Sequence, residues 1–292
     1  MSTAAQPFPL FRLLAGSVCT SFSPVLIKIA SVDPELAGFY RMLFAVAGLF
    51  LLMLLRREKP VVERRPLLYL VGSGIFLSLD FMCWHRSIEL VGPGLSTLLG
   101  NFQVFFTALF SWLMLRERIS PWFVLAVLLA LGGLLLITGV DAASLTTGIQ
   151  LGVFFGLLTA LFYSFYIMGM KQAITGSRIS GSSAVLTVSL TCALFLLVIS
   201  LSKGVQLQVD SGRSLLALAG VGLISTALGW SMISSAMRQI PATLAGLVLL
   251  FQPSLSFLWD ILLFKRATGA LEYLGIGLIL AAIYLGSVRR PE

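Results

Sequence analysis

Two stretches of the chain, 149 residues apart, share one pattern: SIELVGPGLSTLLGNFQ (87–103) and AMRQIPATLAGLVLLFQ (236–252). Leucines align at three and six residues after the shared Gly/Pro position, and both stretches end in Phe-Gln. Farther upstream, Lys28 matches Lys171 at an offset of 143. This pattern indicates an internal repeat, with one copy over 1–140 and the other over 141–292. The identities are few, so a chance match between apolar segments is the alternative.

The composition places this repeat in a membrane. The chain has 292 residues, of which 58% are hydrophobic and 11% are charged, and its mean hydropathy is +0.99. A soluble domain is about half apolar and about a quarter charged. These values exclude a soluble enzyme, a nucleic-acid-binding protein and a disordered scaffold. One spanning helix needs about 20 apolar residues, so ten of them would use about two thirds of the chain.

Apolar runs between charges and Pro or Gly breaks predict ten spanning helices. Their expected spans are 10–30, 36–55, 66–89, 92–115, 121–139, 148–171, 181–201, 214–237, 241–264 and 271–288. Five helices per repeat is an odd number, so the two repeats must cross the bilayer in opposite directions. The expected fold is an all-α polytopic membrane protein of ten transmembrane helices in two inverted five-helix repeats. Such repeats are typical of secondary transporters, whose substrate site lies near the bilayer midplane.

The net charge is +8, and the positions of the Lys and Arg residues indicate the membrane topology. With the N-terminus in the cytoplasm, thirteen Lys and Arg residues fall on the cytoplasmic side and six on the external side. The positive-inside rule then places both termini in the cytoplasm. This distribution explains the basic pI without a nucleic-acid partner. The expected partners are a small-molecule substrate and the lipid bilayer, and a homodimer is left open.

The sequence contains no pattern of a catalytic or metal centre. Its three cysteines lie in apolar runs without metal-ligand spacing, and we expect them to be buried small hydrophobic residues. Gly148, Gly152 and Gly156 recur every four residues, which is typical of close helix packing and not of a nucleotide-binding loop. The chain is therefore not expected to be an enzyme, and neither a cofactor nor a metal is predicted.

Four motifs together indicate a family. They are FYRMLFA (39–45), the stretch 87–103, LRERIS (115–120) with the loop residue Glu117, and LVLLFQPSLSFL (247–258). In their order and spacing the chain resembles the drug/metabolite transporter superfamily, in its EamA-type ten-helix branch. The family usually repeats the loop glutamate in its second half, where this chain has Arg266, so the second copy has diverged. The resemblance implies two inverted five-helix repeats around a central cavity and export of small organic metabolites.

Two charged residues, Asp80 and Arg41, stand out for their depth inside the predicted membrane segments. Asp80 is about 13 Å from the external end of its helix, and Arg41 is about 8 Å from that side. A charge at the bilayer centre costs about 3 kcal/mol on insertion scales, so each residue is expected to have a structural or a functional role. One interpretation is a structural ion pair between them. The other is that Asp80 binds substrate or a coupling proton and that Arg41 receives a substrate carboxylate.

Two glutamines occupy matching positions of the repeat. Gln103 and Gln252 each lie about 14–16 Å into a predicted helix, near the midplane. A neutral amide can hydrogen-bond a solute without the cost of a buried charge. The alternative is that they form hydrogen bonds between helices and so join the two halves.

The sequence thus predicts a secondary transporter that exports amino acids or related small organic metabolites across the inner membrane by alternating access. Three aromatic residues, Trp84, Tyr163 and Trp230, are expected to contact the apolar part of the substrate, although ordinary core packing is the alternative for each. The predicted substrate-binding set is Gln103, Gln252, Trp84, Tyr163, Trp230, Arg41 and Asp80, with Asp80 as the proton-coupling candidate. Alternative functions are an intramembrane enzyme acting on lipid-linked substrates and an exporter of drugs or toxic cations. A passive channel is disfavoured, because its pore would need rings of like polar residues.

Overall fold

The structure is a computed structural model that describes residues 7–32, 34–116, 119–138, 147–175, 177–204, 207–209, 211–264 and 269–288. In these ranges every regular element is a helix. Glu117 and Arg266, the loop positions used in the family comparison, lie outside the described residues. The chain forms two compact units: unit 1 contains Leu79–Met168 and Pro241–Glu292, and unit 2 contains Ala5–Ser78 and Gly169–Ile240. Each unit therefore takes helices from both halves of the sequence.

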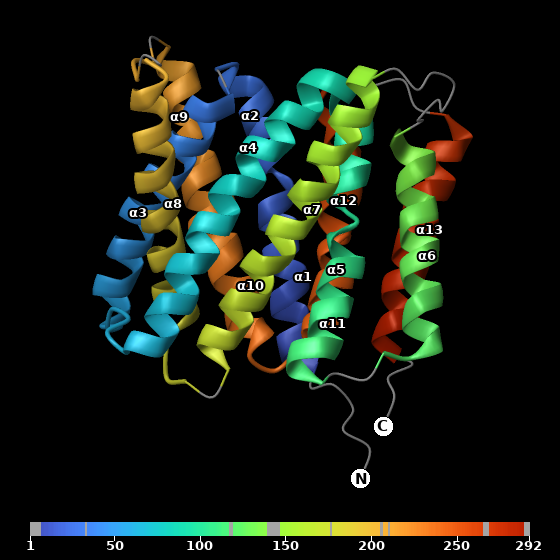
Figure 1. Cartoon of the computed structure of the whole chain (residues 1–292), viewed down its shortest axis with the longest axis horizontal. Coiled ribbons are helices and arrows are strands. Elements are labelled where there is room, and N and C mark those ends of the chain that lie inside the picture. Colours follow the sequence, from blue (N-terminus) through green and yellow to red (C-terminus); the bar gives the residue numbers. More distant parts are fainter. Residues whose placement is uncertain are drawn as a thin grey trace. The chain divides into compact units, whose positions relative to one another are not determined.

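Unit 2 contains the first helices of the chain and the middle of its second half (Figure 1). Its elements are α1 (Pro7–Ser21), α2 (Ser23–Ala30), α3 (Pro34–Arg56), the start of α4 (Arg64–Gly100), the end of α7 (Thr147–Ile174), α8 (Gly181–Ser202), α9 (Gly212–Gly220), the π-helix η2 (Val221–Trp230) and α10 (Ser231–Met237). The first predicted span is interrupted at Phe22. Pro24 near the start of α2 explains this break, because proline lacks the N–H that would continue the helical hydrogen bonds.

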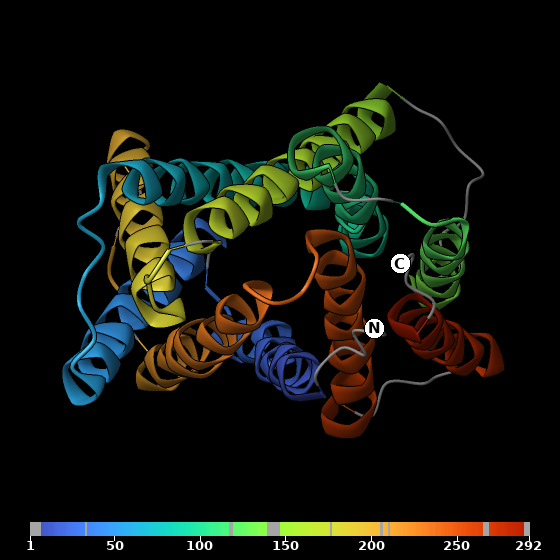
Figure 2. The same cartoon turned by 90° about the horizontal axis from the view of Figure 1, so that it is seen from below.

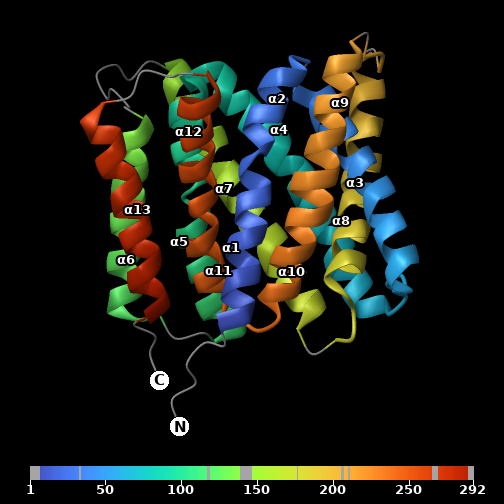
Figure 3. The same cartoon turned by 180° about the vertical axis from the view of Figure 1, so that it is seen from behind.

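Glycines allow the helices of unit 2 to approach closely. A Cβ added at Gly222 would lie 2.5 Å from the Cβ of Phe44 and 2.8 Å from the main-chain oxygen of Arg41. A Cβ added at Gly16 would lie 2.8 Å from the main-chain oxygen of Gly229. These contacts bring α3 and α1 close to η2. Figure 3 also shows α1 beside α10, and Figure 1 shows α3 beside α8. Small residues at such interfaces are the usual basis of helix packing in membranes.

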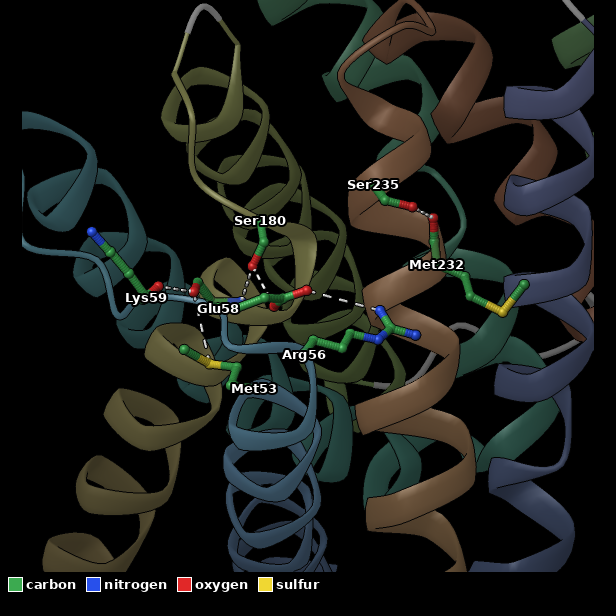
Figure 4. A network of polar contacts seen from close by, with 8 residues as sticks. Met53, Arg56, Glu58, Lys59, Ser180, Met232 and Ser235 are labelled. Atoms are coloured by element: carbon green, nitrogen blue, oxygen red, sulfur yellow. Dashed lines mark hydrogen bonds and ion pairs between the residues drawn. The ribbon is translucent and has the colours of Figure 1, made fainter.

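The loop between α3 and α4 is held against the start of α8. The hydroxyl oxygen of Ser180 accepts a hydrogen bond from the main-chain N–H of Ser183 at 3.0 Å, which caps α8. The same hydroxyl donates to a carboxylate oxygen of Glu58 at 2.6 Å, and the Ser183 hydroxyl donates to the main-chain oxygen of Lys59 (Figure 4). Arg56 lies 3.9 Å from the other carboxylate oxygen of Glu58. These contacts order the loop at this end of unit 2.

Unit 1 contains the remaining helices. Its elements are the rest of α4, α5 (Gln103–Phe110), the π-helix η1 (Ser111–Leu115), α6 (Pro121–Thr138), most of α7, α11 (Ala242–Leu249), α12 (Phe251–Phe264) and α13 (Ala270–Val288). Figures 1 and 2 show α6 and α13 side by side, and these two helices form an extended interface. A Cβ added at Gly133 of α6 would lie only 2.5 Å from the main-chain oxygen of Gly275 in α13.

The helical stretch α4 contains a reversal of the chain. Its residues are helical from Arg64 to Gly100, whereas the sequence predicted a break before residue 92. The Ser96 hydroxyl, however, donates to the main-chain oxygen of Trp84 at 3.3 Å. In a straight helix, twelve residues would separate these groups by about 18 Å. The chain therefore folds back between them, where the sequence has Gly92 and Pro93, and this reversal agrees with the predicted boundary between the segments 66–89 and 92–115.

The predicted number of membrane segments agrees with the structure. Among the described residues, seven helices are long and apolar enough to span a membrane, from Phe8–Ala30 to Ala242–Leu263. Three shorter apolar helices, Gln103–Met114, Pro121–Gly133 and Ala270–Ala282, fall on the other predicted segments. Large hydrophobic side chains on the outer faces, such as Leu55 and Tyr284, are exposed, as expected for helices in contact with lipid.

Candidate functional site

Asp80 is a buried acidic residue of unit 1. It lies in α4, and its exposed fraction is 6%. The Thr159 hydroxyl of α7 makes a long contact of 3.5 Å with the main-chain oxygen of Asp80. Trp84, one turn farther along α4, is half-buried, and its ring centroid lies 5.5 Å from that of His85. A carboxyl group in this position is costly unless it is neutral or compensated, so Asp80 is suited to binding a proton or a cationic group.

The segment that carries Asp80 is held firmly against α7. The Ser87 hydroxyl of α4 donates to the main-chain oxygen of Gly152 at 2.9 Å. A Cβ added at Gly156 would lie 2.7 Å from the Cβ of Leu99 and 3.0 Å from the Ser87 hydroxyl oxygen. The predicted close-packing stripe is thus confirmed at Gly152 and Gly156, whereas Gly148 is exposed.

Gln103 connects helices from the two halves of the sequence. It lies at the start of α5, its exposed fraction is 3%, and its amide nitrogen donates to the main-chain oxygen of Gly246 in α11 at 3.4 Å. Its amide oxygen accepts a hydrogen bond from the Thr107 hydroxyl at 3.1 Å. The Gln103 amide therefore bonds both to α11 and within α5. This favours the interpretation that Gln103 joins helices from the two halves of the chain. Its repeat counterpart Gln252, in α12, is half-buried, so the two environments differ.

One segment of α7 lies close to both Asp80 and Gln103. Thr159 contacts the main chain at Asp80, and five residues later the Ser164 hydroxyl donates to the main-chain oxygen of Gln103 at 3.0 Å. Tyr163 lies between these contacts in the sequence; it is half-buried, and its ring centroid lies 5.5 Å from that of Tyr166. The fold thus brings Asp80, Gln103 and Tyr163 to the same part of unit 1. Nothing in the sequence distinguished Ser164 from other helical serines.

The other two predicted site residues belong to unit 2. Arg41 of α3 is half-buried, and its Nε donates to the Thr226 hydroxyl oxygen at 2.9 Å. Thr226 lies in η2, and its hydroxyl also contacts the main-chain oxygen of Val221, five residues earlier, at 3.4 Å. Trp230, the last residue of η2, is buried. π-Helical turns are rare and are frequent at functional sites. Since Arg41 and Asp80 belong to different units, an ion pair between them stays a prediction.

The sequence did not reveal the environment of Lys171. Lys171 is one of the thirteen basic residues on the predicted cytoplasmic side, but its exposed fraction is only 8%. Its ammonium group donates to the main-chain oxygens of Met237, at 2.7 Å, and of Ile240. The offset that relates Lys171 to Lys28 was visible in the sequence, but the burial depends on tertiary contacts.

No group of three or more His, Cys, Asp and Glu residues in the described part of the chain could hold a metal ion. The buried polar groups instead occur singly along apolar helices that are long enough to span a bilayer. Fold and site therefore define an all-helical polytopic membrane protein built from two repeats, with isolated polar residues inside it.

The EamA-like transporter family matches residues 8–139 and again residues 150–288, and the chain belongs to this family. The chain is 23% identical to the uncharacterized inner membrane transporter YhbE of Escherichia coli K12, over 94% of this chain and 89% of the relative. It is 21% identical to the uncharacterized transporter YxxF of Bacillus subtilis 168, over 78% of this chain and 72% of the relative. Family and relatives indicate a transporter and not an enzyme.

A solved crystal structure has the same fold, with a TM-score of 0.84 and 16% sequence identity over 96% of both chains. This similarity extends over the length of both chains and concerns the fold alone.

Proposed function

We propose that this chain is a secondary transporter of the inner membrane that exports amino acids or related small organic metabolites by alternating access. The observation that carries the proposal is the position of Asp80, which is 6% exposed in a spanning helix and contacts the α7 segment that also carries Tyr163. A carboxylate can receive the ammonium group of an amino acid, and nearby aromatic faces can receive a cation or an apolar side chain. The same carboxylate can instead carry the coupling proton.

In this proposal the repeats comprise residues 1–140 and 141–292, and both termini lie in the cytoplasm. Trp84 and Tyr163 contact the apolar part of the substrate from unit 1, and Gln252 supplies a half-buried amide. Of the other predicted site residues, Trp230 offers an aromatic surface and Arg41 offers a positive charge that fits a carboxylate. Gln103 positions α5 against α11 and contacts substrate only if its amide exchanges the bond to Gly246 for one to the solute.

Counterflow into proteoliposomes tests the proposal. Purified protein is reconstituted, and uptake of a labelled solute is driven by the same unlabelled solute inside, over a panel of amino acids, nucleosides and lipophilic cations, with and without a pH gradient. We expect stimulated flux for at least one amino acid or related metabolite. Flux with the lipophilic cations alone would favour a drug exporter, and an absence of stimulated flux over the whole panel would exclude the proposed substrate class.

Asp80→Asn tests the role of the carboxyl group, because the amide keeps the size and removes the titratable charge. We expect this variant to lose transport or its dependence on the pH gradient. Glu63→Gln is the matched control, since Glu63 is exposed in the loop before α4. Transport by Asp80→Asn that is unchanged in rate and in pH dependence would remove Asp80 from the site.

A further inference from the structure

Basic residues gather on three segments of unit 2. The segments are the loop from α3 to α4 with the residues beside it, the loop from α7 to α8, and the end of α10. Their exposed cations are Arg56, Arg57, Lys59, Arg64, Arg65, Arg178 and Arg238. The described residues of these segments contain only two carboxylates, Glu58 and Glu63. We call these seven cations the basic face of unit 2.

A continuous series of contacts joins the three segments. Arg238 donates to the main-chain oxygen of Ile179, in the loop from α7 to α8. The next residue, Ser180, donates to Glu58 at 2.6 Å, and Glu58 lies 3.9 Å from Arg56 (Figure 4). The basic face is therefore one surface, although its residues come from distant parts of the sequence.

The loop from α3 to α4, which carries most of these cations, is held by its main chain. The Ser183 hydroxyl donates to the main-chain oxygen of Lys59, and the main-chain N–H of Glu58 donates to that of Met53 at 2.9 Å. The Glu58 carboxylate is engaged in the contacts described above, whereas the Lys59 side chain points away from it (Figure 4). The loop therefore presents its cations outward, while one of its two carboxylates is used within the protein.

Two cations of the basic face occupy positions that are unfavourable for their own helix. Arg64 and Arg65 are the first residues of α4. The N-terminus of a helix carries partial positive charge, which repels basic side chains and favours an anion. The positive-inside rule accounts for basic residues on the predicted cytoplasmic side. It does not require contacts that hold them on one surface, so the arrangement points to an anionic ligand.

Exposed apolar side chains lie next to the cations. Leu55, directly before Arg56, is 75% exposed, and Val62, in the loop, is 80% exposed. An apolar side chain beside a cation fits the boundary between the headgroups and the acyl chains of a membrane. This combination favours a lipid over a soluble anion.

We propose that the basic face of unit 2 binds the phosphate groups of anionic phospholipids in the cytoplasmic leaflet. Guanidinium groups bind phosphate oxygens through paired hydrogen bonds, and each basic residue near an anionic membrane strengthens binding about fivefold. Leu55 and Val62 contact the acyl chains of the bound lipid. Because the proposal does not involve the transported solute, its test is separate from counterflow.

Lipid titration of the purified full chain in detergent, followed by native mass spectrometry, measures this preference. The probes are dioleoylphosphatidylglycerol, dioleoylphosphatidylcholine, and glycerol phosphate, which has the phosphate without acyl chains. We expect the phosphatidylglycerol to bind at least about tenfold more tightly than either of the other two. Equal affinities for the two lipids would overturn the proposal. Glycerol phosphate binding as tight as that of phosphatidylglycerol would also overturn it, in favour of a soluble anion.

Two matched variants locate the site. Arg65→Gln removes one cation of the basic face, and Arg213→Gln removes an exposed arginine from the first turn of α9. Figures 1 and 3 show α9 at the opposite end of unit 2 from the loop between α3 and α4. We expect Arg65→Gln to lower the affinity for phosphatidylglycerol about fivefold and Arg213→Gln to leave it unchanged. Equal effects of the two variants would refute a site on the basic face. Arg65→Gln should fold at least as stably as the wild type, because Arg65 opposes the helix dipole.

Ser183→Ala tests the ordered loop without a change of charge. It removes the hydroxyl that donates to Lys59 and keeps the main-chain N–H that Ser180 caps. We expect the affinity for phosphatidylglycerol to fall at least about twofold, because the lipid must then order the loop. An unchanged affinity would refute an ordered site and leave attraction by charge alone. If Ser183→Ala fails to fold, Arg238→Gln takes its place, and an unchanged affinity in that variant would equally refute the proposal.

Discussion

Two adjacent glycines of α6 allow a matched test of helix packing. A Cβ added at Gly133 would lie 2.5 Å from the main-chain oxygen of Gly275 and 3.0 Å from a side-chain carbon of Ile279, whereas a Cβ added at Gly132 would meet nothing within 4 Å. The oxygen belongs to the backbone of α13, so it cannot move away as the end of a flexible side chain could. Gly133→Ala must therefore push α6 and α13 apart, and Gly132→Ala must not.

The expected difference follows from these distances. Both substitutions replace glycine by alanine inside the same helix, so the helix-propensity gain of up to about 1 kcal/mol is common to them. Only Gly133→Ala carries the overpacking cost of about 1–3 kcal/mol. The free energy of unfolding of Gly133→Ala should thus be lower than that of Gly132→Ala by about 1–3 kcal/mol.

Reversible unfolding in mixed micelles, followed by circular dichroism at rising SDS fraction, measures this difference. The two variants are compared with each other and with the wild type, so effects of the detergent cancel. If Gly133→Ala is as stable as Gly132→Ala, the close approach of α6 and α13 is wrong.

Three further substitutions test single contacts. Ser180→Ala removes the cap of α8 and the bond to Glu58, and should lower the free energy of unfolding by about 1 kcal/mol in the same micelle assay; a stability equal to the wild type would contradict the cap. Gln103→Leu should lower it by about 1–2 kcal/mol and change the KM for transport less than twofold, whereas a large rise in KM at full stability would assign Gln103 to substrate binding. Thr226→Val removes the acceptor for Arg41 and should cost about 1–3 kcal/mol, whereas Thr226→Ser should keep most of the wild-type stability; a Thr226→Val protein as stable as the wild type would show that the hydroxyl does not matter.

The membrane segments were predictable because each depends on local composition. A run of apolar residues long enough to cross a bilayer is visible without knowledge of its neighbours. The predicted segment 121–139 corresponds to Pro121–Thr138, and the segment 181–201 corresponds to Gly181–Ser202. The errors occur where the helix geometry changes inside an apolar run, as at Phe22 and in η2, since hydropathy does not record a proline break or a π-turn.

From the sequence, the candidate site could be predicted only as a set of residues and their depth in the membrane. Counting 1.5 Å per residue placed Asp80 and Gln103 inside the membrane, and both are buried. The count could not say which groups they meet. That Gln103 binds Gly246, 143 residues away, and that Arg41 binds Thr226, 185 residues away, follows from how the two halves of the chain pack.

By itself, the sequence determined that this protein is a ten-helix membrane protein with an internal repeat, because bilayer thickness and hydropathy act on each segment separately. Only the tertiary structure decided that each compact unit takes helices from both halves, that α4 reverses between Trp84 and Ser96, and that Lys171 is buried while Lys28 is exposed. The physical reason is that lysines at equivalent positions of a repeat have the same local sequence setting. Their burial depends on which other segments pack over them, and that depends on long-range packing alone.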